Sequence, residues 1–251
     1  MSILVASLIA PPFLDDQRRW GSWLTNCNEI KKSVPGTDVS YYCAVELDGR
    51  NMAPYNKSGW THAVESADVR YETFTYDSGR TRIETNSRIK HICLGRNIIS
   101  QVAIMNKDVT HILTIDGDVI PPADILPNLL EINYPIVAAH IPSYCFIVPS
   151  ITTNPRNSEQ VYPDKWDVQP TPQSSAGAWL IERSVFQSVR WRSDPNYNLS
   201  DDPSYLYDVK NVLGIDPPVL QRTDTVANHW PPAIGPIDTR LSDPRLTPLT
   251  N

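Results

Sequence analysis

The stretch His111-Ile112-Leu113-Thr114-Ile115-Asp116-Gly117-Asp118-Val119-Ile120-Pro121-Pro122 is the most informative part of this 251-residue chain. Its first part, residues 111–115, has the length and apolar composition of a buried strand. The acidic triplet follows at once, and the two prolines then open a short helix over residues 126–130, since proline is well tolerated in a first helical turn. A strand followed by an acidic turn and a helix is typical of α/β proteins.

The same alternation extends in both directions along the chain. Apolar and β-branched runs predict strands at residues 3–10, 39–47, 136–139 and 176–181. Apolar residues at helical spacing predict helices at residues 18–33 and 87–106, and a short one from residue 184. Polar segments predict loops at residues 147–173 and 50–84, the latter with short strands near 71–76. The chain is therefore predicted to be an α/β protein, with a mostly parallel sheet flanked by helices in a single domain.

Composition and charge limit the classes to which the protein can belong. The length suffices for one substantial core, and the 23 prolines punctuate the connections between elements. We expect residues 1–232 to form the domain and residues 233–251 to form a proline-rich tail. The formal net charge of −6 argues against a nucleic-acid-binding protein, because such proteins need positive charge to displace phosphate counterions.

Neither a membrane span nor a signal peptide is indicated. No apolar run reaches the length of about 18 residues that a membrane-spanning helix needs. The apolar residues 1–10 lack a basic leader and end in Pro11-Pro12, which favours a buried strand. The four cysteines do not have the spacing of a zinc or redox motif. We therefore expect a cytoplasmic protein without an integral membrane segment.

The acidic triplet carries the strongest chemical signal in the sequence. Asp116 and Asp118 follow a predicted buried strand, and open α/β sheets bind ligands at the carboxyl ends of their strands. Carboxylate oxygens suit Mg²⁺, which often takes one or two protein carboxylates and completes its shell with substrate phosphates. Gly117 lets the backbone turn closely against a ligand. The alternative is a polar turn that satisfies its own hydrogen bonds.

Further blocks surround this triplet in a fixed order. Leu94-Gly95-Arg96-Asn97 precedes the helix and strand, and Tyr134-Pro135-Ile136-Val137-Ala138-Ala139 follows the triplet. The segment 176–186 then combines a small-residue strand with an Arg-x-x-Phe helix. In this order, over residues 88–230, the blocks resemble the core of glycosyltransferases with the GT-A fold, and they are most similar to the broad family 2. The resemblance implies a Rossmann-like GT-A domain in which the Arg-Asn pair starts a helix.

The resemblance also implies a set of site residues. The donor would be a nucleotide-sugar, linked to UDP or GDP, whose diphosphate is bridged by Mn²⁺ or Mg²⁺. Asp118 would be the more direct metal ligand, with Asp116 beside it and His229 completing the shell, although a histidine beside tryptophan is often simply packed. Asp202, or else Asp201, lies where the family carries the catalytic base of an inverting reaction, but the same acidic pair also suits a helix N-cap.

Contacts to the nucleotide are expected at the ends of the first two strands and around the resemblance blocks. Arg96 suits either a contact to the diphosphate or base, or a salt bridge at the start of the helix. The expected set consists of Ala10, Pro11, Glu46, Asp48, Arg96, Asn97, Asp116 and Gly117.

The sequence thus predicts a metal-dependent glycosyltransferase that moves a sugar to a hydroxyl acceptor with inversion. The acceptor is left open among a glycan, a protein glycan, a lipid-linked sugar and modified DNA, the last disfavoured by the charge. One alternative is a catalytically inactive GT-A domain that acts as a carbohydrate-binding or scaffolding module. Another is a nucleotidyltransferase. Such an enzyme would normally carry a glycine-rich basic loop near the N-terminus, whereas residues 8–12 of this chain, Leu8-Ile9-Ala10-Pro11-Pro12, contain neither glycine nor a basic residue.

Overall fold

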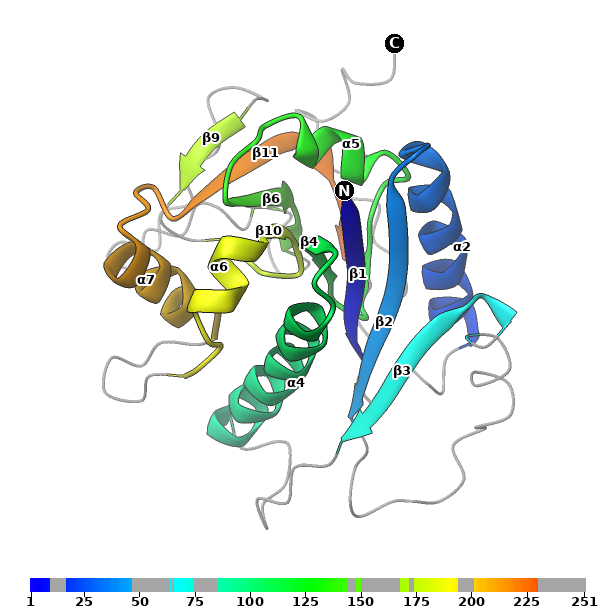
Figure 1. Cartoon of the computed structure of the whole chain (residues 1–251), viewed down its shortest axis with the longest axis horizontal. Coiled ribbons are helices and arrows are strands. Elements are labelled where there is room, and N and C mark those ends of the chain that lie inside the picture. Colours follow the sequence, from blue (N-terminus) through cyan, green and yellow to red (C-terminus); the bar gives the residue numbers. More distant parts are fainter. Residues whose placement is uncertain are drawn as a thin grey trace.

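A mostly parallel sheet forms the centre of the computed structural model (Figure 1). The structure describes residues 1–9, 17–46, 64, 66–74, 85–143, 148–149, 168–171, 174–193 and 201–229. Within these ranges the main sheet has eight strands, in the order β3 (Val69–Phe74), β2 (Asp38–Glu46), β1 (Ser2–Ile9), β4 (Val109–Ile115), β10 (Ala178–Glu182), β6 (Ile136–His140), β11 (Val219–Val226) and β9 (Val168–Thr171). Two short pairs accompany it: β5 (Val119–Ile120) with β12 (Asn228–His229), and β7 (Pro142–Ser143) with β8 (Val148–Pro149).

The strand directions define where a ligand crevice belongs. Strands β3, β2, β1 and β4 run parallel to one another, as do β6 and β11, whereas β10 is antiparallel to both its neighbours and β9 is antiparallel to β11. From β1 the chain moves outward to β2 and β3, and it returns to β4 on the other side of β1. The strand order therefore reverses between β1 and β4. In open α/β sheets, ligands bind outside the carboxyl ends of the strands at such a point.

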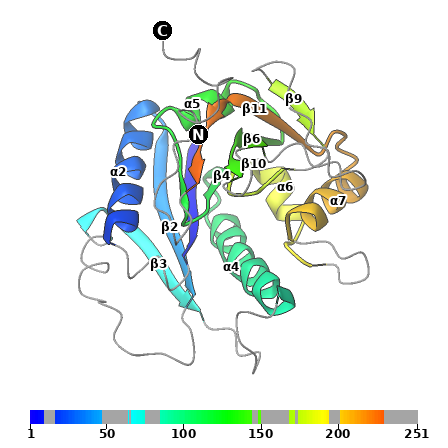
Figure 2. The same ribbon diagram turned by 180° about the vertical axis from the view of Figure 1, so that it is seen from behind.

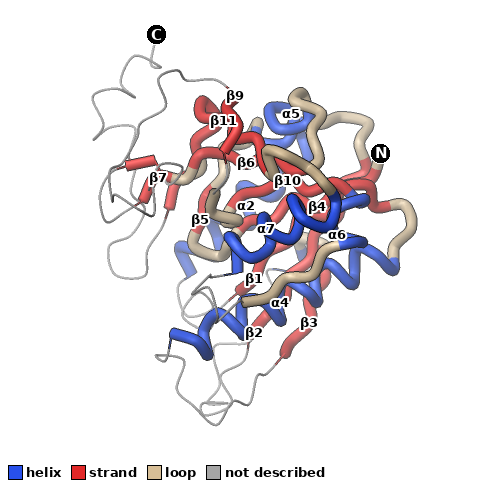
Figure 3. Tube along the Cα trace, turned by 90° about the vertical axis from the view of Figure 1, so that its left-hand side faces the viewer, coloured by secondary structure: helices blue, strands red, loops and turns tan. Residues whose placement is uncertain are grey.

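Helices cover both faces of the sheet (Figures 1 and 2). In the described part of the chain they are α2 (Gln17–Ser33), α4 (Thr85–Met105), α5 (Ile125–Leu130), α6 (Arg183–Ser188) and α7 (Asp201–Leu213). Helices α2 and α5 contribute to the apolar core on one face, and α4, α6 and α7 to the core on the other. The side view shows α4, α6 and α7 together on the near side (Figure 3).

Strand β1 shows why both faces are covered. Successive side chains of a strand point to opposite faces, so a strand that is apolar at nearly every position needs cover on both. Ile3 and Val5 join the core that contains Trp23 of α2. Leu4 joins the core that contains Ile99 of α4.

The predicted fold class is confirmed, since the described residues form one α/β domain with a mostly parallel sheet flanked by helices. Strands β1, β2, β3, β4, β6 and β10 and helices α2, α4, α5 and α6 lie where the sequence pattern predicts them. None of the described helices combines the length and apolar character that crossing a membrane requires. Residues 233–251 lie outside the described ranges, so the proline-rich tail and its boundary stay a prediction.

Three details of the predicted layout are wrong. The pair Arg96-Asn97 lies in the middle of α4 and not at its start, because the helix begins at Thr85. Strand β9 lies within the predicted loop 147–173, because Pro170 makes its sequence resemble a loop. Proline is tolerated in this strand because β9 is at the edge of the sheet. Strand β11 was not predicted, because its buried side includes polar residues: Gln221, Thr223 and Thr225.

Gly95 allows α4 to pack directly on the sheet. A Cβ atom at this position would collide with Cδ1 of Leu8 on β1 and would lie 3.0 Å from Cζ of Phe74 on β3. Gly21 of α2 is a useful contrast, because a Cβ atom there would meet nothing within 4 Å. The close approach of α4 to the sheet, which sets the position of the next residue, Arg96, therefore depends on the missing side chain of Gly95.

The replacement Gly95→Ala is expected to lower the free energy of unfolding by about 1–2 kcal/mol, because the cost of overpacking exceeds the gain in helix propensity. Gly21→Ala is the matched control, and it should raise the same free energy by about 0.5–1 kcal/mol. Urea unfolding followed by circular dichroism measures both. Stabilisation by both replacements would contradict the tight packing of α4 on β1.

Candidate active site

The acidic turn is held at the carboxyl end of β4 by backbone hydrogen bonds. The Asp116 N–H donates to the carbonyl of Gly177 at 2.9 Å, and the Val119 N–H donates to the carbonyl of Asp116 at 2.9 Å. A Cβ atom on Gly177 would lie 2.8 Å from Cδ1 of Ile141 and 3.4 Å from Oδ2 of Asp116. Gly177, which was not among the predicted site residues, therefore lets the chain before β10 approach the Asp116 carboxylate closely.

The guanidinium of Arg96 lies at the centre of the site and binds three carboxylates. Its Nη2 lies 3.2 Å from Oδ1 and 3.3 Å from Oδ2 of Asp116, and its Nη1 donates to the carboxylates of Asp201 and Asp202. The Arg96 side chain is only 5% exposed. Helix α4 thus joins the end of β4 to the first turn of α7, and the predicted acidic residues Asp116, Asp201 and Asp202 come together around one cation. Of the two roles expected for Arg96, the salt bridge is present, but Arg96 lies in the middle of α4 and its partners lie in the first turn of α7 and after β4.

A cluster of three aromatic side chains packs against this guanidinium. The Arg96 Cζ lies 4.6 Å from the centre of the Trp191 ring, a distance suited to a cation–π interaction. Trp191 stacks on Tyr205 at 3.9 Å and on Trp179 at 5.8 Å between ring centres. Asn97 fixes Trp191, because its side-chain amide donates to the Trp191 carbonyl at 2.8 Å and accepts from the Trp191 N–H at 3.0 Å. The amide of Asn97, a predicted nucleotide contact, is bonded to the protein backbone here.

The crowding of carboxylates changes their proton affinity. Burial raises the pKa of Asp202 to about 7; Arg96 opposes this rise, and the carboxylates of Asp201 and Asp116 add to it. Burial also raises the pKa of Asp116 above its ordinary value, again against the effect of Arg96. One oxygen of Asp202 accepts a hydrogen bond from the Ala176 N–H at 3.1 Å. The side chains of Asp116 and Asp202 are 32% and 20% exposed, so both carboxyl groups can be reached from outside.

The candidate metal ligands lie on neighbouring segments. Asp118 is half-buried, and its carboxylate is close enough to Asp116 to raise the pKa of that residue. Strand β12 places the backbone of His229 opposite Val119, the residue that follows Asp118. The side chain of His229 lies outside the described part of the structure. Among the described residues, no group of three or more potential metal-binding side chains is present.

Of the predicted nucleotide contacts on or after the first two strands, Glu46 lies within the described residues. Glu46 ends β2, is 4% exposed and pairs with Nδ1 of His91 on α4, a partner that the sequence pattern did not suggest. Ala10 and Pro11 follow β1, and Asp48 follows β2, but all three lie outside the described residues. Because β1, β2 and β4 are parallel, the last residues of β1 and β2 lie at the same edge of the sheet as Asp116.

Comparison with known proteins gives structural similarity alone. No protein-family model matches the chain, and no curated protein matches it significantly in sequence. Similar solved structures include A197 from STIV, with 12% identity over 96% of this chain and 88% of that chain and a TM-score of 0.49. They also include the galactosyltransferase LgtC (11% identity, 83% and 69% coverage, TM-score 0.37) and mouse xyloside xylosyltransferase 1 (12% identity, 84% and 75% coverage, TM-score 0.36). At these identities and TM-scores, the similarities do not bear on the activity of this chain.

The proton on Asp202 makes stability depend on pH. The native state keeps this proton up to about pH 7, whereas an unfolded aspartate loses it near a pKa of about 3.9. Since the native state binds more protons between these values, the free energy of unfolding falls as the pH rises from about 4 to about 7. Between pH 5 and pH 8, the free energy of unfolding of the variant Asp202→Asn should fall by about 1–3 kcal/mol less than that of the native protein. Urea unfolding at each pH measures both.

Asp108→Asn is the matched control for this measurement, because Asp108 is exposed and remote from Arg96 in the fold. This variant should keep the pH dependence of the native protein. The interpretation would be wrong if Asp202→Asn and the native protein lost the same free energy over this pH range.

Proposed function

We propose that this chain is a glycosyltransferase of the GT-A type, which transfers a sugar from a nucleotide-sugar donor to a hydroxyl acceptor. One observation carries the proposal. The acidic turn Asp116-Gly117-Asp118 lies where the strand order reverses between β1 and β4, and Arg96 gathers Asp201 and Asp202 beside it. The resemblance of the sequence to glycosyltransferase family 2 agrees with this arrangement.

In the proposal the donor occupies the carboxyl edge of the sheet. The carboxyl ends of β2, β1 and β4 lie at this edge in that order, so the nucleoside would lie across the ends of β1 and β2. Ala10, Pro11, Glu46 and Asp48 stay proposed contacts, and Glu46 would have to leave its buried pairing with His91 to reach the nucleoside. The diphosphate would then lie against the acidic turn. Such a pairing of two negatively charged groups requires a cation between them.

The residues of the turn fit a divalent ion such as Mn²⁺ or Mg²⁺. The turn carries two carboxylates, Asp116, which is partly exposed and bound to Arg96, and Asp118, which is half-buried, and the backbone of His229 pairs with the following residue, Val119. Ions of this kind often take only one or two protein carboxylates, and substrate phosphates complete the shell. Asp116, Asp118 and His229 would hold the ion. When bound, it would supply positive charge that stabilises the leaving diphosphate.

Asp202 is the proposed catalytic base. Its carboxyl group is oriented by Arg96 and by the Ala176 N–H, and it remains 20% exposed to an incoming acceptor. A general base works best when its pKa lies near the working pH, and a value of about 7 meets this condition. Asp202 would accept the proton of the acceptor hydroxyl as that oxygen attacks the anomeric carbon and the bond to the nucleoside diphosphate breaks. Attack from the side opposite the leaving group gives inversion.

Asp201 and Asn97 position the Arg96 guanidinium in the proposed mechanism. The side chain of Asp201 is only 9% exposed and is bound to Arg96, so it helps to fix the guanidinium. Asn97 holds Trp191 under the same guanidinium. Both therefore position Arg96, which in turn holds Asp116 and Asp202.

Binding and hydrolysis across a panel of UDP- and GDP-linked sugars, with and without Mn²⁺, test the proposal. The native chain should bind and slowly hydrolyse one donor only with the metal. Asp118→Ala should lower the metal-dependent turnover by about 100-fold or more, because it removes a proposed ligand. Asp124→Ala is the matched control: Asp124 is exposed and its side chain makes no capping hydrogen bond, so turnover should be unchanged.

Each alternative result has a distinct meaning. Binding of a donor without any turnover would favour a catalytically inactive binding module. Failure of every donor to bind, with and without Mn²⁺, would contradict the glycosyltransferase proposal.

A further inference from the structure

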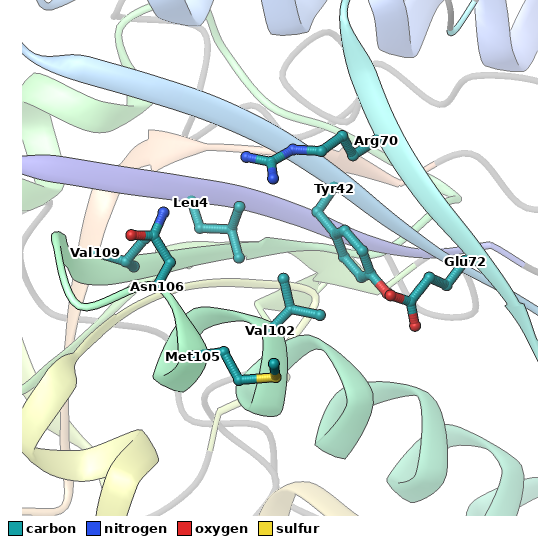
Figure 4. A pocket seen from close by; sticks show the side chains of 8 residues that line it. All are labelled: Leu4, Tyr42, Arg70, Glu72, Val102, Met105, Asn106 and Val109. Carbon is teal, nitrogen blue, oxygen red and sulfur yellow. The ribbon is translucent and has the colours of Figure 1, made fainter.

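A cavity of about 330 Å³ lies between the end of α4 and the first halves of the strands β1, β2 and β3 (Figure 4). Its volume is within the range of small-molecule sites, which is about 300–1,000 Å³. Val109, which begins β4, lines the cavity, whereas Asp116 follows the other end of this seven-residue strand. At a rise of about 3.3 Å per residue, the cavity is roughly 20 Å from the acidic turn. It is therefore distinct from the candidate active site.

The floor of the cavity is apolar. Leu4 of β1 and Val109 are buried, and Val102 of α4 is half-buried. Met105 in the last turn of α4 is 75% exposed and continues the apolar wall to the mouth of the cavity. A bound apolar group would remove these side chains from water, which is the general driving force for such binding.

The rim of the cavity is charged. Arg70 and Glu72 project from the edge strand β3 on the same face, since they are two residues apart. In Figure 4 the Arg70 guanidinium extends over Leu4, and the Glu72 carboxylate lies beside the Tyr42 hydroxyl. Across the residues that the structure describes, no ion pair joins Arg70 to a carboxylate. In the described part of the chain the guanidinium thus lies above an apolar floor outside any ion pair, with the Glu72 carboxylate two residues away on the same face.

The Tyr42 hydroxyl lines the cavity beside the Glu72 carboxylate (Figure 4). The Tyr42 side chain is 4% exposed, and its hydroxyl oxygen has no hydrogen-bond partner of normal geometry among the described residues, despite the nearby Glu72. Burial, then the charge of Glu72 and a hydrogen bond to its carboxylate, raise the pKa of Tyr42, so the hydroxyl keeps its proton. Buried polar groups in folded proteins nearly always have a partner. The Glu72 carboxylate takes that place here, which leaves Arg70 as the cation at the rim.

We propose that this cavity binds a small carboxylic acid with an apolar body. The carboxylate accepts hydrogen bonds from Arg70, and the apolar body lies on Leu4 and Val102. A guanidinium is well suited to this task, because its planar fork of donors matches the two oxygens of a carboxylate. The proposal does not depend on the transferase function, since none of its residues belongs to the candidate active site.

Three probes with one apolar body test the proposal: 4-phenylbutyrate, 4-phenylbutanol and 4-phenylbutylamine. They differ only in the charge of the head group. Calorimetric titration of the full chain should show that the carboxylate binds at least tenfold more tightly than the alcohol or the amine. Excess UDP with Mn²⁺ should not displace it, because the nucleotide is expected at the opposite edge of the sheet.

Two variants separate the parts of the site. Arg70→Gln should abolish the preference for the carboxylate, and this exposed position on an edge strand can change without loss of the fold. Val102→Trp should fill the cavity and weaken all three probes at least tenfold. Arg190→Gln is the matched control, because Arg190 is exposed and does not line the cavity.

Three results would overturn the proposal. They are no binding of 4-phenylbutyrate to the native chain, equal affinities for the three probes, and an unchanged preference for the carboxylate in Arg70→Gln. If Val102→Trp did not fold, the Arg70→Gln comparison would still decide the matter.

Discussion

The buried guanidinium of Arg96 is the interaction on which the geometry of the candidate active site depends. Three carboxylates, from Asp116, Asp201 and Asp202, surround this one cation. Without the cation they would repel one another in a buried place, and loss of one partner of a buried ion pair typically costs about 3–5 kcal/mol. The arrangement also keeps a surplus of negative charge at the edge of the sheet. A divalent ion and the phosphates that it attracts would complete the charge balance there.

The fold explains why this cluster forms where it does. Gly95 brings α4 against β1 and β3, which places Arg96 beside the end of β4. Gly177 lets the start of β10 approach Asp116 from the other side. Trp191, held by Asn97, supports the guanidinium from below. Two close approaches of the backbone and one aromatic ring thus fix an ion-pair network that links β4, α4 and α7.

The sequence predicts local structure well and long-range partners poorly. The apolar run before Asp116 predicted a strand and the prolines after Asp118 predicted the start of a short helix, because strand patterning and proline chemistry act over a few residues. The partners of Arg96 are 20, 105 and 106 residues away, and no local pattern encodes such contacts. Strand β11 was not predicted for a related reason. Gln221 is completely buried by tertiary packing, whereas its polar side chain indicates an exposed position in the sequence.

Anomalous diffraction from crystals soaked with Mn²⁺ and UDP would locate the ion and the diphosphate together. We expect an anomalous peak between the carboxylates of Asp116 and Asp118, with the diphosphate beside it at the carboxyl ends of β1 and β4. A Mn²⁺ peak that lies away from both aspartates, or UDP bound at another edge of the sheet, would contradict this expectation.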